Sequence, residues 1–496
     1  MSVVEPNPIL LAEAAHGHRS MLRSQVIKFG CKLTSVLLLA RLVTPDDHGL
    51  FAMASSVVLL LTLFRDAGLG AAAVQAASLS EVQLTALFWC HLSIGVLLTL
   101  ATLATAPWAA MFYANPAVSP LLAVMSSAFL LIGAGGFVRA QLERASRFAE
   151  VSWIESVAAV GGTLGMIGAA LAGAGAYSFA VYLILSEALA TALAWRACRF
   201  RPSGSPRWAS LRGLLRTGTD VMTYQTIVYF LQQVDGIAVG RWFGAHSLGL
   251  YNRANQLLAL PNLYIATPLN QVALVTLSRI GRDSAGFVSH ARTTATVIAH
   301  LILPLFAICV VLPAETLRLV LGPQWPEAAP LLRVLSIASA AATLTSLGYA
   351  INVAAGQTRR LVVSAACALP LTIAAVWLAL PNGPIGIARA IAVMNGVLLI
   401  PRLWWALREL PEGLPGYLRA LTGPFLCSAA VTIGLWCGSR SVGEVSWAWR
   451  LTAGCAGAVL AILAATAVSA RLRREWKTVV SYLPIPGRHP VEPVNG

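Results

Sequence analysis

Two lysines in a long apolar stretch near the N-terminus are the first residues whose type and spacing suggest chemistry. Lys28 and Lys32 are four residues apart, so they share one face of a helix. Two ammonium groups on one face could bind a dianion such as a diphosphate, and each is a flexible point charge that can follow a moving group. The alternative is that both snorkel toward lipid phosphates, which suits the more deeply placed Lys32 less well.

A third cation, Arg253, and an acid, Asp235, lie in two later apolar stretches at equal distances from residue 244. If the chain turns there, the two side chains are at similar depth and can pair across a helical hairpin. One alternative is a structural ion pair that holds the two helices together. The other is a functional role, in which Arg253 binds an anion such as a diphosphate while Asp235 tunes it or carries a proton.

Two glutamates complete the set of candidate charges inside apolar stretches. Glu155 is one turn inside its helix, and a partner from the basic segment 139–147 is the simpler interpretation. Glu187 lies in the middle of a helix without an obvious local partner. It is therefore either a protonatable group that couples transport to an ion or a buried neutral acid. His48 and His246 are expected to be solvated turn residues.

Composition shows what kind of chain must position these charges. Of the 496 residues, 57% are hydrophobic and 11% are charged, and the mean hydropathy is +0.73. A soluble domain carries about 25% charged residues, so the numbers favour a polytopic membrane protein. The net charge of +15 does not indicate nucleic-acid binding, because the basic residues form short clusters between apolar runs and match loops that face anionic lipid. The eight cysteines have no metal-type spacing, and no metal, cofactor or catalytic motif is expected.

Apolar runs of about 20 residues, the length needed to cross a bilayer, predict an all-α fold of about fourteen transmembrane helices. The expected spans are 24–43, 49–65, 82–106, 118–138, 150–173, 176–195, 217–241, 248–278, 287–312, 328–354, 361–380, 384–405, 417–437 and 447–470. With both termini placed in the cytoplasm, the outer loops hold only Arg241, Arg318, Arg440 and Arg450. This asymmetry supports the orientation and the helix count.

The sequence repeats weakly at an offset of 200 residues, where Gly49-Leu50 matches Gly249-Leu250 and Arg41 matches Arg241. Six helices per repeat make the two halves parallel, with two further helices outside the repeat. The expected organisation is a cytoplasmic segment, a six-helix bundle, a basic cytoplasmic linker, a second six-helix bundle, helices 13 and 14, and a cytoplasmic tail. Their bounds are 1–23, 24–195, 196–216, 217–405, 406–470 and 471–496.

Two runs resemble a known family. ARLVTPDDHGLFAMASSVVLLLTLFRDAGLGAAAVQ (40–75) resembles the first helical hairpin of bacterial polysaccharide exporters, and SLGLYNRANQLLALPNLYIATPLNQVALVTLSRI (247–280) resembles the corresponding hairpin of their second half. These exporters are the Wzx-type oligosaccharide flippases of the multidrug/oligosaccharidyl-lipid/polysaccharide superfamily. Within the first run, Thr44-Pro45-Asp46-Asp47 reads independently as a capped helix start.

The resemblance implies two bundles around a central cavity and a bacterial inner-membrane location. It also implies alternating-access transport of undecaprenyl-diphosphate-linked oligosaccharide repeat units to the periplasmic leaflet, for exopolysaccharide, capsule or lipopolysaccharide assembly. Lys28, Lys32 and Arg253 are then the candidate substrate ligands, and Glu187, Asp235 and Glu155 the candidate coupling or charge-pair residues. Membrane lipids, a proton or sodium counter-ion and polysaccharide polymerase machinery are the other partners considered.

Rival functions stay open. One is a drug or cation antiporter of the same superfamily, although such an exporter should have an acidic cavity and the first helix here is basic. Another is a flippase for lipid-linked peptidoglycan precursors. A membrane glycan polymerase or ligase fits less well, because the outer loops are short and carry no cluster of catalytic side chains. The last rival is a membrane scaffold that transports nothing.

Overall fold

The computed structural model describes residues 8–66, 80–198, 202, 218–280, 285–408, 413–442 and 446–482, which are almost entirely helical and include no strand. The first half contains α1 (Pro8–Leu42), α2 (Pro45–Asp66), α4 (Glu81–Tyr113), α5 (Val118–Arg144), α6 (Phe148–Leu171), α7 (Tyr177–Ala197) and α9 (Gly218–Pro261). The second half contains η2 (Asn262–Ala266), α10 (Thr267–Ile280), α11 (Ala285–Val311), α12 (Pro313–Val320), η3 (Pro326–Ala328), α13 (Ala329–Ala354), α14 (Thr358–Ala379), η4 (Leu380–Asn382), α15 (Gly383–Leu407), α16 (Gly413–Ser441), α17 (Trp447–Val468) and α18 (Ala470–Tyr482).

The helices have the length and apolar composition that membrane spans need. Among the described residues, 11 stretches qualify as candidate spans, and two of these, of 56 and 49 residues, are long enough for two crossings each. The longer one turns at Gly244, whose φ of 79° is a conformation that glycine adopts without strain. The other turns at η4 and Gly383. Helix α1 carries Lys28, Lys32 and Arg41 and is not among these stretches, but it is long enough to be a further span. The predicted polytopic all-helical fold is confirmed.

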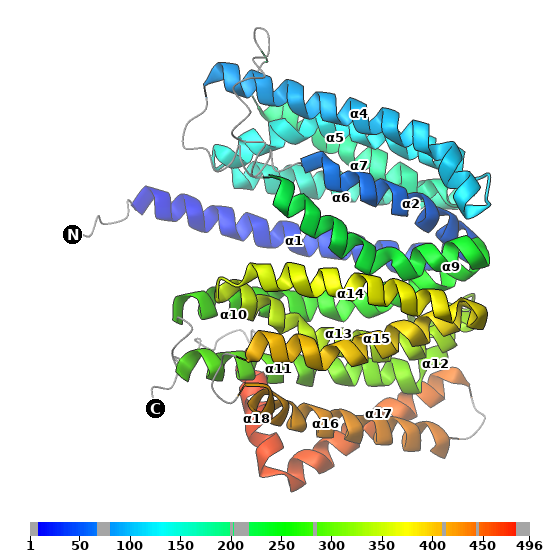
Figure 1. The fold of residues 1–496 in the computed structure, drawn as a ribbon, viewed down its shortest axis with the longest axis vertical. Helices are drawn as coiled ribbons and strands as arrows, with labels where there is room; N and C mark the ends of the chain where they lie inside the picture. The colour runs from blue at the N-terminus through cyan, green and yellow to red at the C-terminus, as the bar shows by residue number, and fades with distance from the viewer. Residues whose placement is uncertain are drawn as a thin grey trace. The chain divides into compact units, whose positions relative to one another are not determined.

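The chain forms two compact units, Met1–Gly249 and Leu250–Gly496. In the first unit, α4 packs on α5, α5 on α7, α7 on α6, and α6 on α1, while α2 contacts both α4 and α5. Figure 1 shows α4, α5 and α7 lying along one another in this order. The α1–α6 contact brings the lysine face of α1 to the helix that carries Glu155.

The second unit repeats this packing order with its own helices. Here α11 packs on α13, α13 on α15, and α15 on α14, while α10 contacts both α11 and α13. Each of these contacts has its equivalent in the first unit when α10, α11, α13, α14 and α15 are matched in chain order with α2, α4, α5, α6 and α7. The last pair, α16 and α17, packs closely and is joined to the unit through α11 and α16. The shared packing of these five helices agrees with the repeat that the sequence predicts.

Local chemistry explains how α2 begins. The Thr44 hydroxyl accepts a hydrogen bond from the Asp47 backbone N–H at 3.2 Å, and Pro45 occupies the first helical position. Asp46 and Asp47 lie in the first turn, where carboxylates interact favourably with the partial positive charge of the helix end. Asp47 also accepts a hydrogen bond from the Ala176 N–H at 3.1 Å, next to the start of α7. The capped start predicted from the sequence is confirmed.

Three differences from the predicted bounds concern the ends of the chain and the linker. Helix α1 begins at Pro8, so much of the expected cytoplasmic segment continues the first span as helix. The expected tail contains a further helix, α18. Most of the expected basic linker, 196–216, lies outside the described residues.

Candidate functional site

Lys28 of α1 is paired with an acid of the neighbouring helix. Its Nζ lies 2.7 Å from Glu155 Oε2 of α6, and the two side chains are 32% and 40% exposed. One turn earlier, the hydroxyls of Ser156 and Ser24 form a 3.0 Å hydrogen bond between the same two helices. The partner of Glu155 is therefore Lys28, and the expectation of a partner from 139–147 is wrong. That expectation considered only residues near in sequence, whereas the partner comes from the packing of α6 on α1.

Glu187 also has a partner, which the sequence interpretation missed. Arg139 Nη2 lies 3.0 Å from Glu187 Oε2, and the two side chains are only 20% and 22% exposed. Arg139 was expected in a cytoplasmic loop, but α5 continues to Arg144 and carries this residue on its helical surface. Since α5 packs on α7, the guanidinium reaches the acid of α7 directly. Glu187 is thus a charge-pair residue in this structure, while a coupling role for it stays a prediction.

The two ion pairs are close enough to interact through Glu143 of α5. This carboxylate interacts electrostatically with both Glu155 and Arg139. At the end of α5, outside the spans, Arg147 makes two hydrogen bonds to the Glu150 carboxylate and one of 3.1 Å to the Ala197 carbonyl. The bonds to Glu150 raise the pKa of Arg147 above its usual value. An acid four residues after Arg139 on one helix was the signal that could have indicated this network.

Lys32 differs from the other charges of this group. Its side chain is exposed, and within the part of the chain that the structure describes it forms neither an ion pair nor a hydrogen bond. It lies one turn beyond Lys28 on α1, the helix that packs on α6. An intramembrane cation with no acid beside it keeps its full charge available for an anionic ligand. Among the described candidates of the first unit, Lys32 is therefore the one best prepared to bind an anion.

Arg253, the candidate in the second half of α9, is buried with 5% of its surface exposed. Its Nη1 donates a 2.6 Å hydrogen bond to Gln256 Oε1. The guanidinium carbon lies 5.8 Å from the centroid of the Trp325 ring, which is fully buried. A planar guanidinium over an aromatic face is a favourable cation–π contact. These contacts fix the buried Arg253 side chain, and a role in binding a ligand stays a prediction.

Asp235 lies in the first part of α9 and is 9% exposed. Its Oδ1 accepts a 2.9 Å hydrogen bond from the backbone N–H of Gly236. Asp235 and Arg253 belong to different compact units, and their pairing across the Gly244 turn stays a prediction.

A close crossing joins α2 to the second half of α9 at positions that the sequence repeat makes equivalent. A Cβ atom added to Gly49 would overlap the Ala245 carbonyl, and one added to Gly249 would overlap the Pro45 carbonyl. Beside them, His246 Nδ1 lies 3.0 Å from Asp46 Oδ2. Gly49 and Gly249 are 200 residues apart, as are Asp46 and His246. The crossing is therefore nearly symmetric.

The two histidines near this crossing are not simple solvated turn residues. His48 is buried and its ring lies 5.0 Å from that of Phe179, so the prediction is wrong for it. His246 stays about half exposed but faces Asp46.

The described charges can bind an anion, whereas the described residues show no arrangement suited to metal chemistry. No group of three His, Cys, Asp or Glu side chains that could hold a metal ion occurs among them. The described acids of the first unit at Glu155 and Glu187 are each neutralised by a neighbouring cation. Among the described candidates of the first unit, Lys32 is the cation that no described acid neutralises by an ion pair.

The fold and the charges together define a polytopic, helical membrane protein whose two units share the packing of five corresponding helices. Comparison with solved structures identifies the fold. The lipid II flippase MurJ in an inward closed conformation superimposes with a TM-score of 0.73 at 14% identity, covering 92% of this chain and 98% of that chain. An inward-facing multidrug resistance MATE family transporter of the MOP superfamily gives 0.61 at 16% identity, covering 76% and 93%.

The sequence places the chain in a family within this fold. The family described as polysaccharide biosynthesis protein matches residues 38–330, more than half of the chain, and the protein belongs to it. The exporter resemblance predicted from the two hairpin runs is thereby confirmed.

Curated relatives are 24 to 25% identical to this chain over the aligned regions. The lipopolysaccharide biosynthesis protein WzxC of Escherichia coli (strain K12) is 24% identical, covering 63% of this chain and 64% of that protein. The succinoglycan biosynthesis transport protein ExoT of Rhizobium meliloti (strain 1021) is 25% identical, covering 62% and 63%. The teichuronic acid biosynthesis protein TuaB of Bacillus subtilis (strain 168) is 24% identical, covering 74% and 77%. The chain thus spans slightly less than two thirds of the length of the first two relatives.

Proposed function

We propose that this protein is a flippase that moves undecaprenyl-diphosphate-linked oligosaccharide repeat units from the cytoplasmic to the periplasmic leaflet of a bacterial inner membrane by alternating access. It acts in exopolysaccharide, capsule or lipopolysaccharide assembly and is a transporter rather than an enzyme. The observation that carries the proposal is the exposed Lys32, which forms no ion pair with a described residue, next to the Lys28–Glu155 pair on a membrane helix. Family membership and the transport names of relatives support it.

The physical requirement is to carry a diphosphate and a hydrated sugar past hydrocarbon. A charge at the centre of a bilayer costs at least about 2.5 kcal/mol even on lenient scales, and an isolated anion costs far more. A cation already held in the membrane lowers this barrier, because it replaces part of the hydration that the phosphates lose. Lys32 supplies such a cation, and Lys28 supplies a second when a phosphate displaces Glu155. Within the second unit, Arg253, fixed by Gln256 and Trp325, is the candidate phosphate ligand.

The arrangement of acids argues against a cation antiporter. A site that attracts cationic drugs needs carboxylates whose charge is not already neutralised. Here the two acids at Glu155 and Glu187 each contact a basic side chain at 2.7 and 3.0 Å. Lys32, which forms no ion pair with a described residue, favours an anionic substrate.

The decisive experiment follows lipid-linked intermediates in a deletion strain. Loss of the protein is expected to remove external polymer and to accumulate undecaprenyl-linked single repeat units, which stay inaccessible to lectin in spheroplasts. Normal external glycan with unchanged lipid-linked pools would contradict the proposal. Accumulation of lipid-linked peptidoglycan precursors instead would assign the protein to that substrate.

Lys32 provides the matched residue-level test. Lys32→Ala is expected to insert normally and to lose most export, whereas Lys32→Arg keeps the charge and a large part of the activity. Arg318→Ala is the control, because Arg318 is an exposed cation on α12 outside the proposed site. Membrane levels of each variant are measured by immunoblot, and export by the external polymer. Wild-type export by Lys32→Ala would remove Lys32 from the mechanism.

A further inference from the structure

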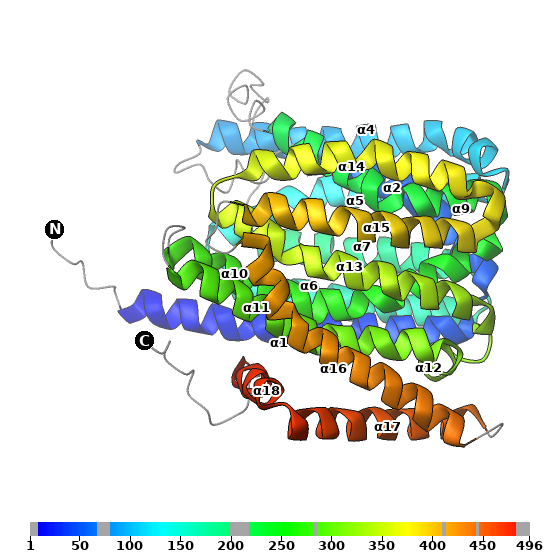
Figure 2. The same cartoon turned by 60° about the horizontal axis from the view of Figure 1, so that its bottom comes forward.

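The final described helix, α18, lies crosswise to the span that precedes it. Helix α17 ends at Val468, whose side chain is 87% exposed, and α18 begins at Ala470. Ser469 is the residue between the two helices. Its hydroxyl accepts a 3.3 Å hydrogen bond from the Leu472 N–H and so caps the start of α18. Figures 1 and 2 both show α18 running across the end of α17. A helix that is crosswise to a transmembrane span lies along the membrane surface.

The apolar face of α18 is already used by the protein. Leu472 and Val479 are 3% and 0% exposed, and the helix contacts α11, α16 and α17. Between them, Trp476 packs edge-on against the buried His300 ring of α11, with 5.7 Å between the ring centroids. A surface helix usually enters lipid with its apolar face. In α18 this face packs against the protein, so a different face points outward.

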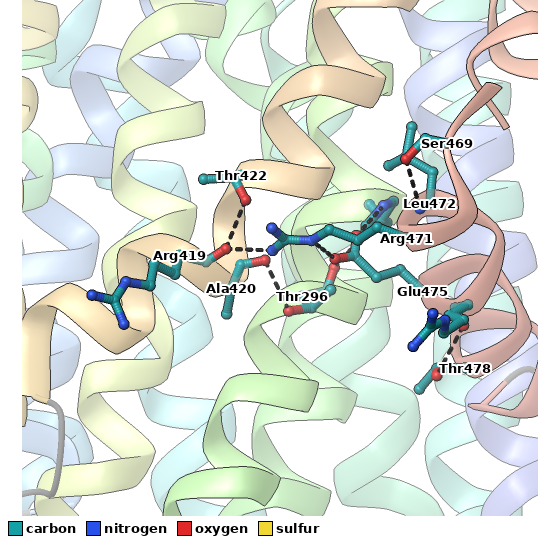
Figure 3. A network of polar contacts seen from close by, with 11 residues as sticks. Thr296, Arg419, Ala420, Thr422, Ser469, Arg471, Leu472, Glu475 and Thr478 are labelled. Carbon is teal, nitrogen blue, oxygen red and sulfur yellow. Dashed lines mark hydrogen bonds and ion pairs between the residues drawn. The ribbon is translucent and has the colours of Figure 1, made fainter.

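A buried carboxylate fixes the rotation of α18 about its own axis. Glu475 is 16% exposed, and its Oε2 lies 3.4 Å from Nε2 of the fully buried His300. A Cβ atom on Gly423 of α16 would overlap this carboxylate, so the position of the Glu475 side chain against α16 requires glycine there. Arg471 closes the network, since its Nε donates to Glu475 Oε1 at 2.8 Å and its Nη2 donates to the Arg419 carbonyl. Figure 3 shows Arg471 between Arg419 and Glu475.

The outward face of α18 carries three exposed cations. Arg473, Arg474 and Lys477 are exposed, and none of them forms an ion pair with a residue that the structure describes. Because Glu475 and the apolar residues hold the opposite face against the protein, the three side chains point away from it together. They are positioned at the end of a membrane span, where phospholipid headgroups lie.

We propose that α18 is a membrane-surface anchor whose Arg473, Arg474 and Lys477 bind the phosphates of anionic phospholipids. The occupant is a lipid surface, because the three cations lie beside the exposed end of a span and their charge complements an anionic leaflet. Each basic residue close to such a surface changes binding by about fivefold. Three of them together give a preference for anionic over zwitterionic lipid on the order of 100-fold at this helix.

The test uses the full chain in nanodiscs of phosphatidylcholine alone or mixed with phosphatidylglycerol. Hydrogen–deuterium exchange of peptides covering 470–482 reports local opening of this helix. We expect exchange of wild-type α18 to slow by at least about tenfold in the anionic discs. The triple variant R473Q/R474Q/K477Q should lose this lipid dependence, and R473K/R474K/K477R should keep it.

The matched control, R318Q/R389Q/R440Q, removes the same charge from three exposed arginines elsewhere and should respond like wild type. Equal exchange of wild-type α18 in both lipids would overturn the proposal, as would an unchanged response in R473Q/R474Q/K477Q. If the control variant also loses the lipid dependence of exchange, the effect comes from the net charge of the protein and the proposal is overturned. If soluble glycerophosphate reproduces the slowing on neutral discs, the site binds free phosphate instead of a lipid surface.

Discussion

The crossing of α2 and α9 allows a quantitative prediction, because two glycines there leave no room for a side chain. An ideal Cβ at Gly249 lies 2.8 Å from the Pro45 carbonyl carbon and 3.1 Å from the Gly49 nitrogen, and it overlaps the Pro45 oxygen. The contacting atoms are backbone, so relief requires the helices to move apart. We expect Gly249→Ala to destabilise the protein by about 1–3 kcal/mol through overpacking, reduced by the roughly 1 kcal/mol that alanine gains in a helix.

The two substitutions at the crossing should not be additive. Gly49→Ala meets the Ala245 backbone, with its Cβ 2.9 Å from Ala245 Cα, so it forces the same separation of the two helices. Once either alanine has moved the helices apart, the second meets less resistance. The double variant should therefore be less destabilised than the two single variants together, with a coupling energy of roughly 0.5–3 kcal/mol.

The assay is thermal unfolding of purified protein in detergent, with export measured in cells. Gly136→Ala on α5 is the matched control, because a Cβ there has nothing within 4 Å and should leave stability equal or slightly higher. A Gly249→Ala variant that melts with wild type and exports normally would refute the close approach. Strict additivity of the two alanines would refute the shared contact while leaving the individual overlaps intact.

Three further predictions concern the two ion pairs and the Trp325 site. Arg139→Gln should leave Glu187 without its cation and destabilise the protein by about 1–3 kcal/mol, whereas R139Q/E187Q should recover part of the loss in thermal unfolding. Trp325→Ala should destabilise the protein by about 3–5 kcal/mol, since it empties the site of a fully buried ring and removes the cation–π contact with Arg253. Trp325→Phe should lose less stability, and equal melting temperatures of the two variants would contradict this order. Lys28→Gln should change stability by less than about 1 kcal/mol, because the ion pair is partly exposed. It should reduce export more than Glu155→Gln does. If Glu155→Gln lowers the amount of external polymer more than Lys28→Gln, Lys28 does not bind the phosphate.

Much of the fold could be predicted from the sequence because the bilayer imposes it. Apolar length and the positions of arginine gave the spans, and the weak match of Gly49 with Gly249 indicated a repeat that the equivalent packing of the two units supports. The candidate charges were also found, because a charge in an apolar run stands out. Their partners were not found, since Lys28–Glu155 and Arg139–Glu187 join residues 127 and 48 positions apart. Such contacts depend on which helices are neighbours, and hydropathy does not contain that information.

The pairing of the acids bears on what drives transport. If Glu187 carried a coupling proton, it would have to give up Arg139 in each cycle, although the two are only about one-fifth exposed and lie 3.0 Å apart. An inside-negative membrane potential instead favours outward movement of an anion by about 2.3 kcal/mol per charge per 100 mV. A diphosphate that keeps two charges gains roughly twice that, which is enough to bias export strongly. A site made positive by Lys32 and by a displaceable Lys28 fits this source of energy, because it has to bind the anion and release it but does not have to exchange a proton.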